Sequence, residues 1–238
     1  MCTKCDLQEL SRRKLFGLGG MAFAGSLLAG RHSHAADYAT TTVTIDEAIA
    51  KLKAGNDKYV QAPEVCARDL KSSREHVANL QTPWVTILGC SDSRVPPELL
   101  FGGLGVGELF VARNAGNIVD MATMGTIEYG VAVLKTPVIL VMGHERCGAV
   151  AAACEIVEKK TTFPGSIGKM VEAVVPAARS VEKAPGNFVD NAVRANAKQS
   201  AAKIATDSEI VAGLVKSGKV KVIAARYDLD DGRVEYLA

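Results

Sequence analysis

The stretch from Trp84 to Arg94, WVTILGCSDSR, decides the fold of this chain, because an apolar run gives way there to polar residues that can carry chemistry. Its first five residues form a short apolar run that is rich in β-forming side chains, and such a run predicts a buried strand. A second apolar run, Pro137 to Met142, predicts another strand, and it is followed by His144 and Cys147 within Gly-His-Glu-Arg-Cys-Gly. Cys90 and this later pair therefore each stand where a buried strand ends. In an open α/β sheet, sites are built at the carboxyl edge of the strands.

Two thiols and one imidazole at this edge suit Zn²⁺, which binds Cys sulfur and His nitrogen tetrahedrally and keeps a fourth position for water in catalytic sites. The predicted ligands of one Zn²⁺ per chain are therefore Cys90, His144 and Cys147. As a fourth ligand, Asp92 would close the site and make it structural. Arg94 favours the open form, because it can bind the Asp92 carboxylate through two parallel N–H bonds and hold it off the metal. In this dyad Asp92 would accept a hydrogen bond from the proton of zinc-bound hydroxide and orient the nucleophile.

The rest of the pattern predicts helices that alternate with strands. Thr44 to Glu47 has the form of a capping box and begins an amphipathic helix that runs to about Val60. Asp231-Gly232 lies between two β-rich runs and predicts a hairpin. The other expected elements are a strand at Leu109 to Ala112, a loop at Arg113 to Asn117, helices at Met121 to Leu134, Ala149 to Glu158, Ser166 to Ser180 and Asn187 to Lys216, and hairpin strands at Lys219 to Tyr227 and Arg233 to Leu237.

Composition and charge limit the classes of partner. The 238-residue chain is 48% hydrophobic and 23% charged, as globular proteins are, and one domain over residues 36–238 is expected. Residues 1–35 hold five Lys/Arg and two Asp/Glu, so residues 36–238 carry 23 positive and 24 negative charges, a net charge of −1. This near-neutral charge does not favour binding to nucleic acid or to an anionic membrane.

The first 35 residues are interpreted as an export signal. Arg12-Arg13 precedes an uncharged stretch from Leu15 to Gly30, and Ser33-His34-Ala35 has the form of a cleavage site. The segment resembles a bacterial twin-arginine signal peptide, which predicts a periplasmic or otherwise exported protein. A retained anchor is the alternative, but 16 residues fall short of the ~20 that span a bilayer. Cys66 and Cys154 are expected to be buried free thiols, and a bridge between them is the alternative if the compartment is oxidising.

At the metal-ligand residues the sequence resembles the β-class carbonic anhydrases. The motifs are C-x-D-x-R at positions 90 to 94 and H-x-x-C at positions 144 to 147, with Gly-Glu-Leu-Phe-Val-Ala-Arg-Asn and Ile-Glu-Tyr-Gly between them. The likeness extends from about Thr44 to Tyr236. It implies an α/β fold with a central, mainly parallel sheet flanked by helices, an N-terminal helical arm and a C-terminal β-hairpin. It also implies reversible hydration of CO2 to bicarbonate and a proton, and a homodimer or homotetramer with sites near the subunit interface.

The same resemblance indicates a substrate pocket. By their offsets from the ligands, Gln81 matches a glutamine whose amide donates to the substrate, and Phe110 and Tyr129 match aromatic residues that shape an apolar CO2 pocket. The two aromatic residues are equally compatible with packing in the core.

Two other functions are compatible with the motifs. One is a zinc-stabilised scaffold without turnover, which the presence of Arg94 disfavours. The other is hydrolysis of COS or CS2, which would depend on pocket width and access.

Overall fold

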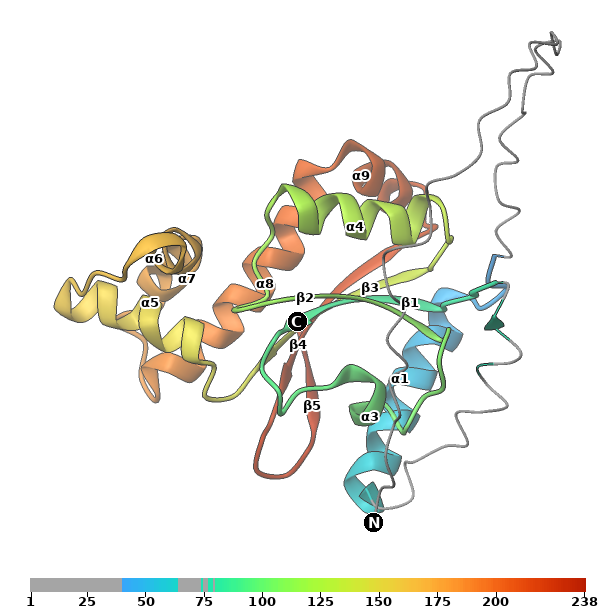
Figure 1. Ribbon diagram of the computed structural model, residues 1–238, viewed down its shortest axis with the longest axis horizontal. Coiled ribbons are helices and arrows are strands. Elements are labelled where there is room, and N and C mark those ends of the chain that lie inside the picture. The colour runs from blue at the N-terminus through green and yellow to red at the C-terminus, as the bar shows by residue number, and fades with distance from the viewer. Residues whose placement is uncertain (1–39, 64–73, 75–76, 79) are drawn as a thin grey trace, which may run out of the picture. The chain divides into compact units, whose positions relative to one another are not determined.

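The computed structural model describes residues 40–63, 74, 77, 78 and 80–238, and it confirms the expected α/β fold (Figure 1). Within these residues the sheet has five strands in the order β2-β1-β3-β4-β5. Four of the strands run parallel, and β5 returns antiparallel to β4 as the expected C-terminal hairpin. The strands are β1 (Val85–Cys90), β2 (Leu109–Asn114), β3 (Val138–His144), β4 (Lys221–Tyr227) and β5 (Val234–Leu237).

The register of the central strands places the candidate ligands at one edge of the sheet. Every residue of β1 and of β3 is buried, which explains why both strands read as continuous apolar runs. Cys90 is the last residue of β1 and is paired with Asn114, the last residue of β2. His144 is the last residue of β3 and is paired with Tyr227 at the end of β4. Because β1 and β3 are parallel neighbours, their ends meet at the same edge.

Helices cover both faces of the sheet (Figure 1). The expected N-terminal helix is α1 (Ile45–Gln61), and it packs on one face through Ala48 and Leu52. On the other face lie α4 (Met121–Ala132), α8 (Phe188–Asp207) and α9 (Glu209–Lys216). To one side of the sheet, α5 (Gly148–Lys159), α6 (Gly165–Glu172) and α7 (Val175–Ser180) pack together with α8. The short α3 (Pro97–Leu100) follows Pro96.

The N-terminal arm is tied to the rest of the domain by polar contacts. Its capping box is confirmed, because the Thr44 hydroxyl accepts from the Glu47 amide and the Glu47 carboxylate accepts from the Thr44 amide. Further along α1, the buried Asn56 donates to the carbonyls of Leu100 and Gly232, at 3.2 and 2.9 Å. The helix therefore connects the loop after β1 to the C-terminal hairpin.

Two long helices expected from the sequence are each divided. Residues 166–180 form α6 and α7, and Pro176 lies in the first turn of α7, where proline is tolerated. The expected helix from Asn187 to Lys216 breaks at Ser208, which was not predicted. The Ser208 hydroxyl caps α9 by accepting from the Val211 amide at 3.1 Å and donates to the Glu128 carboxylate at 2.6 Å, so a contact with α4 helps to fix the break.

Two boundaries near the site also differ from expectation. Strand β2 continues through Asn114, where a loop from Arg113 was expected, because it stays paired with β1 as far as Cys90. The hairpin loop spans residues 228–233 and is longer than a tight Asp-Gly turn. The Asp228 carboxylate accepts from the amides of Asp230 and Asp231, which stabilises the wider loop.

Candidate active site

Three soft donor atoms converge where β1 and β3 end. Cys90 and His144 end their strands, and Cys147 is the residue before the first turn of α5. The ligand atoms of these three buried side chains lie within 4.8 Å of one another, and the two Sγ atoms are 3.9 Å apart. Two sulfurs and one imidazole nitrogen at this spacing form a donor set that suits Zn²⁺.

The His144 imidazole is oriented for metal binding. Its Nδ1 lies 2.9 Å from the Glu145 carbonyl, so Nδ1 carries the hydrogen and Nε2 carries the lone pair. Among the described residues, Nε2 is fully buried and has no hydrogen-bond partner. A buried polar atom without a partner is costly, and a metal ion at Nε2 would remove that cost. The residues present therefore fit a bound metal ion.

The two thiols share a hydrogen bond in the cluster. The pKa of Cys90 is lowered, chiefly because the Cys147 thiol donates a hydrogen bond to it, and the pKa of Cys147 is raised for the same reason. Backbone amides in the first turn of α5 act in the opposite direction on the pKa of Cys147, but their effect is smaller. Without a metal the pair thus keeps a proton that metal binding would displace.

Asp92 is held by Arg94 in a bidentate ion pair. The Arg94 guanidinium donates to Oδ1 at 2.9 Å and to Oδ2 at 2.7 Å, and the Arg94 amide donates to Oδ1 at 3.0 Å. These bonds hold the pKa of Asp92 far below its usual range, so the carboxylate is ionised at any physiological pH. Oδ2 also lies 3.9 Å from Nε2 of His144, which places this oxygen beside the cluster.

Arg113 supports the ligand loop in a way that the sequence did not reveal. Its guanidinium donates to the Cys90 carbonyl at 2.8 Å and to the Asp92 carbonyl at 2.7 Å. One side chain from β2 thus fixes the backbone on both sides of Ser91. The sequence could not show this role, because it depends on the register that places Arg113 beside the loop.

The loop between His144 and Cys147 is fastened to the C-terminal hairpin. Arg146 adopts a positive φ of 52° and forms a bidentate ion pair with Asp230, at 2.6 and 2.9 Å. The Glu145 amide donates to the Tyr227 carbonyl at 2.9 Å. Residues about 80 positions apart therefore set the path of the second ligand loop, a contact that motif spacing could not predict.

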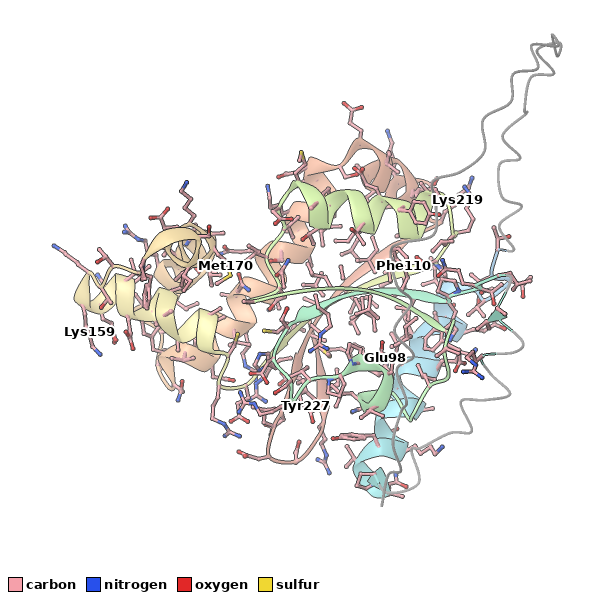
Figure 2. The ribbon with its side chains drawn as sticks, in the orientation of Figure 1. Glu98, Phe110, Lys159, Met170, Lys219 and Tyr227 are labelled. Carbon is pink, nitrogen blue, oxygen red and sulfur yellow. The ribbon has the colours of Figure 1, made fainter. Side chains whose placement is uncertain are left out.

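The three residues expected to line a pocket lie away from the cluster of their own chain. Phe110 is paired with Thr86, four residues before Cys90, which places it about 13 Å back along the strand. Figure 2 labels Phe110 on β2 and Tyr227, which pairs with His144 at the ligand edge. The rings of Phe110 and Tyr129 stack with centroids 5.8 Å apart, and Gln81 is exposed before β1 begins.

Comparisons with known proteins agree with this arrangement. A model of the family described as Carbonic anhydrase matches residues 85–234. The chain is 35% identical to a carbonic anhydrase of Mycolicibacterium smegmatis over 184 residues, which cover 77% of this chain and 89% of the relative. It is 34% identical over 182 residues to carbonic anhydrase 2 of Mycobacterium tuberculosis, covering 76% of this chain and 87% of that protein.

Solved structures show the same fold. A Coccomyxa β-carbonic anhydrase in complex with acetazolamide matches with a TM-score of 0.62 and 30% identity, over 79% of this chain and 86% of that one. One of two tetrameric β-carbonic anhydrases from Sordaria macrospora also has a TM-score of 0.62, with 25% identity over 69% of this chain and 85% of its own. The chain therefore belongs to the β-class carbonic anhydrase family and is an enzyme of that family, whose reaction is the hydration of CO2.

Several expectations concern residues that the structure does not describe. The export signal over residues 1–35 lies outside the described residues, and so does Cys66, while Cys154 is buried in α5. Within the described part of the chain, none of the helices combines the length and apolar character needed to cross a membrane.

Replacing Arg113 with Lys tests its support of the ligand loop. Lysine keeps the charge but lacks the planar fork that reaches both carbonyls, so we expect affinity for added Zn²⁺ to fall about 10-fold to 100-fold, the usual effect of losing a partner that orients a ligand. Chelator competition on the metal-free protein measures this affinity. The exposed Arg179→Lys on α7 is the matched control. Unchanged affinity in Arg113→Lys would mean that the two carbonyl bonds do not position the ligands.

Proposed function

We propose that this protein interconverts CO2 and bicarbonate plus a proton with one Zn²⁺ per chain held by Cys90, His144 and Cys147. The observation that carries the proposal is the arrangement of the cluster. Three buried donors converge around an unpaired imidazole nitrogen, while the neighbouring Asp92 carboxylate is occupied by Arg94. This arrangement supports a three-ligand site that keeps a fourth position, as catalytic zinc sites do, over a closed site with Asp92 as the fourth ligand.

The bound ion would supply a nucleophile, because Zn²⁺ lowers the pKa of water to about 7. The protein's part is to orient that nucleophile. Asp92 is ionised and acceptor-only, and its Oδ2 is the oxygen nearer to His144 Nε2. It can therefore accept a hydrogen bond from the nucleophile and leave an oxygen lone pair directed at CO2. Arg94 keeps the carboxylate ionised and fixes its plane through two parallel bonds.

We also propose that the enzyme is a homodimer or homotetramer in which the pocket is shared between subunits. Gln81, Phe110 and Tyr129 lie toward the opposite end of the sheet from the cluster of their own chain, so they can contact substrate only at the site of a second copy. A two-fold axis would give each of two sites one set of ligands and one set of pocket residues. The tetrameric Sordaria relatives support an assembly of this kind. The alternative is that the two rings only pack in the core.

We propose in addition that residues 1–35 direct export through the twin-arginine pathway to the periplasm. The support is the order of the paired arginines, the uncharged stretch and the small-residue cleavage site. Amino-terminal sequencing of protein from the periplasmic fraction should begin at about Ala36. Recovery of the full-length chain in the cytoplasm or the membrane fraction would contradict export.

The Asp92–Arg94 pair is tested by Asp92→Ala and Arg94→Ala. Neither residue is among the three proposed ligands, so zinc content should stay at one per chain while CO2 hydration falls by about two orders of magnitude or more, as expected for a positioned acid-base group. Stopped-flow hydration assays with metal analysis of the same samples measure both quantities. Arg179→Ala, at an exposed position on α7, is the control.

The pH profile of Arg94→Ala distinguishes orientation from ionisation. Without Arg94 the depressed pKa of Asp92 would rise back toward its usual value of about 4, which is still far below neutral. Asp92 would therefore remain ionised from pH 6.5 to 9, and the deficit should persist across this range. Full activity of Arg94→Ala at any of these pH values would refute the orienting role of the pair.

The shared pocket is tested by mixing two inactive variants, Asp92→Ala and Gln81→Ala. If the pocket is shared, a mixed dimer has one site with both defects and one site with neither. Random assembly of equal amounts should then restore about a quarter of wild-type activity. A mixture of Asp92→Ala and Arg94→Ala is the control, because every site in it carries a defect.

If the activity of the mixture stays at the mean of the two variants, the shared pocket is contradicted. Either each pocket then lies within one subunit, or Gln81 has no role in it. Full activity of Gln81→Ala alone would show the latter directly.

A further inference from the structure

Helix α8 reaches the Cys90 ligand through two consecutive hydrogen bonds. The amide of Asn196, a buried residue in the middle of α8, donates to the Gly116 carbonyl at 2.8 Å. The Gly116 N–H in turn donates to the Cys90 sulfur at 3.4 Å. One turn later on the same helix, the Ser200 hydroxyl donates to the carbonyl of Asn117 at 3.2 Å. Among the described residues, no hydrogen bond links Asn117 to the Cys90 sulfur.

The position of Gly116 leaves its amide little freedom of its own. Its φ is +80°, a conformation that glycine adopts at low cost. A Cβ at this position would lie 3.1 Å from Ala149 Cβ and 3.4 Å from Val174 Cγ2, so the backbone packs closely against the helices beyond the metal-ligand edge. A carbonyl held from one side by Asn196 and a backbone packed from the other fix the direction in which the Gly116 N–H points.

The same helix also touches the strand that carries the second ligand. A Cβ on Gly143, the residue before His144, would lie 3.0 Å from Val193 Cγ1. Val193 precedes Asn196 by about one turn of α8. Thus α8 packs directly against the backbone that leads to His144 and, through Asn196, against the loop that donates to Cys90.

We propose that Asn196 is a positioning residue for the metal centre: it holds Gly116 so that its N–H donates to the Cys90 sulfur, and this bond sets how strongly that sulfur donates charge to the metal. A hydrogen bond to a ligand sulfur withdraws electron density from it, and partners that orient or polarise ligands commonly change metal affinity or activity about 10-fold to 100-fold. The inference depends on the proposed Zn²⁺ site and goes beyond it, because it assigns a function to a helix that supplies none of the proposed ligands.

The test compares Asn196→Leu and Asn196→Asp with Ser200→Ala. Leucine branches at the same carbon as asparagine and removes the donor, while aspartate keeps the shape and cannot donate when it is ionised. Ser200→Ala removes a hydrogen bond of the same helix to the next carbonyl without affecting the bond to sulfur, so it is the matched control. Two quantities are measured: Zn²⁺ affinity by chelator competition, and the sulfur-to-metal charge-transfer absorption of the Co²⁺-substituted protein.

Both Asn196 variants should bind Zn²⁺ about 10-fold to 100-fold more weakly, because the loop that orients the Cys90 sulfur is no longer held in place. Their Co²⁺ charge-transfer band should shift, because the sulfur has lost a hydrogen bond. Ser200→Ala should match the wild type in both measurements. A merely structural role would lower stability and leave the band of the folded, Co²⁺-loaded protein unmoved.

The proposal is overturned if the band and the affinity of the folded Asn196 variants match those of Ser200→Ala. It is also overturned if neither Asn196 variant folds, because Asn196 would then be needed for folding rather than for positioning the ligand. Failure of the proposed function is a separate result: in that case the wild-type protein itself would not bind one Zn²⁺ per chain.

Discussion

The structure depends on one constraint, the burial of two thiols and an unpaired imidazole nitrogen within 4.8 Å of one another at the ends of two adjacent parallel strands. Leaving a polar atom buried without a partner costs about 1–3 kcal/mol, and the sulfurs favour keeping a proton between them. A divalent cation removes both costs at once, because it pairs with the nitrogen and displaces the proton. A bound metal ion would thus relieve a cost that arises from the same packing that makes β1 and β3 a buried core.

Around this cluster, each ligand segment is held from a different part of the chain. Arg113 fixes the backbone after Cys90, the hairpin holds Glu145 and Arg146, and α8 reaches the Cys90 sulfur through Gly116. Arg113 contacts the backbone at Cys90, while the Gly116 N–H donates to the Cys90 sulfur itself. In the proposed open site, the two bonds by which Arg94 holds Asp92 off the metal would also make Asp92 an oriented acceptor.

Much of this could be predicted from local patterns. A buried parallel strand has a short apolar run whatever surrounds it, and the paired motifs at positions 90 to 94 and 144 to 147 carry both the ligands and the dyad. What could not be predicted depends on register or on distant partners. The contacts of Arg113 require the pairing of β1 with β2, and the break at Ser208 depends on Glu128 in another helix. Gln81, Phe110 and Tyr129 were identified by offset alone, which cannot say to which subunit's site a residue belongs.

The central claim is that the cluster holds one Zn²⁺ in a form that turns over CO2. The most direct test is stopped-flow CO2 hydration by the purified mature protein from about pH 6.5 to 9, with zinc quantified in the same sample. The account predicts one Zn²⁺ per chain and fast hydration that rises with pH as water is deprotonated. One zinc per chain with no hydration at any pH in this range would contradict it, and would mean a closed site or a metal that serves the fold alone.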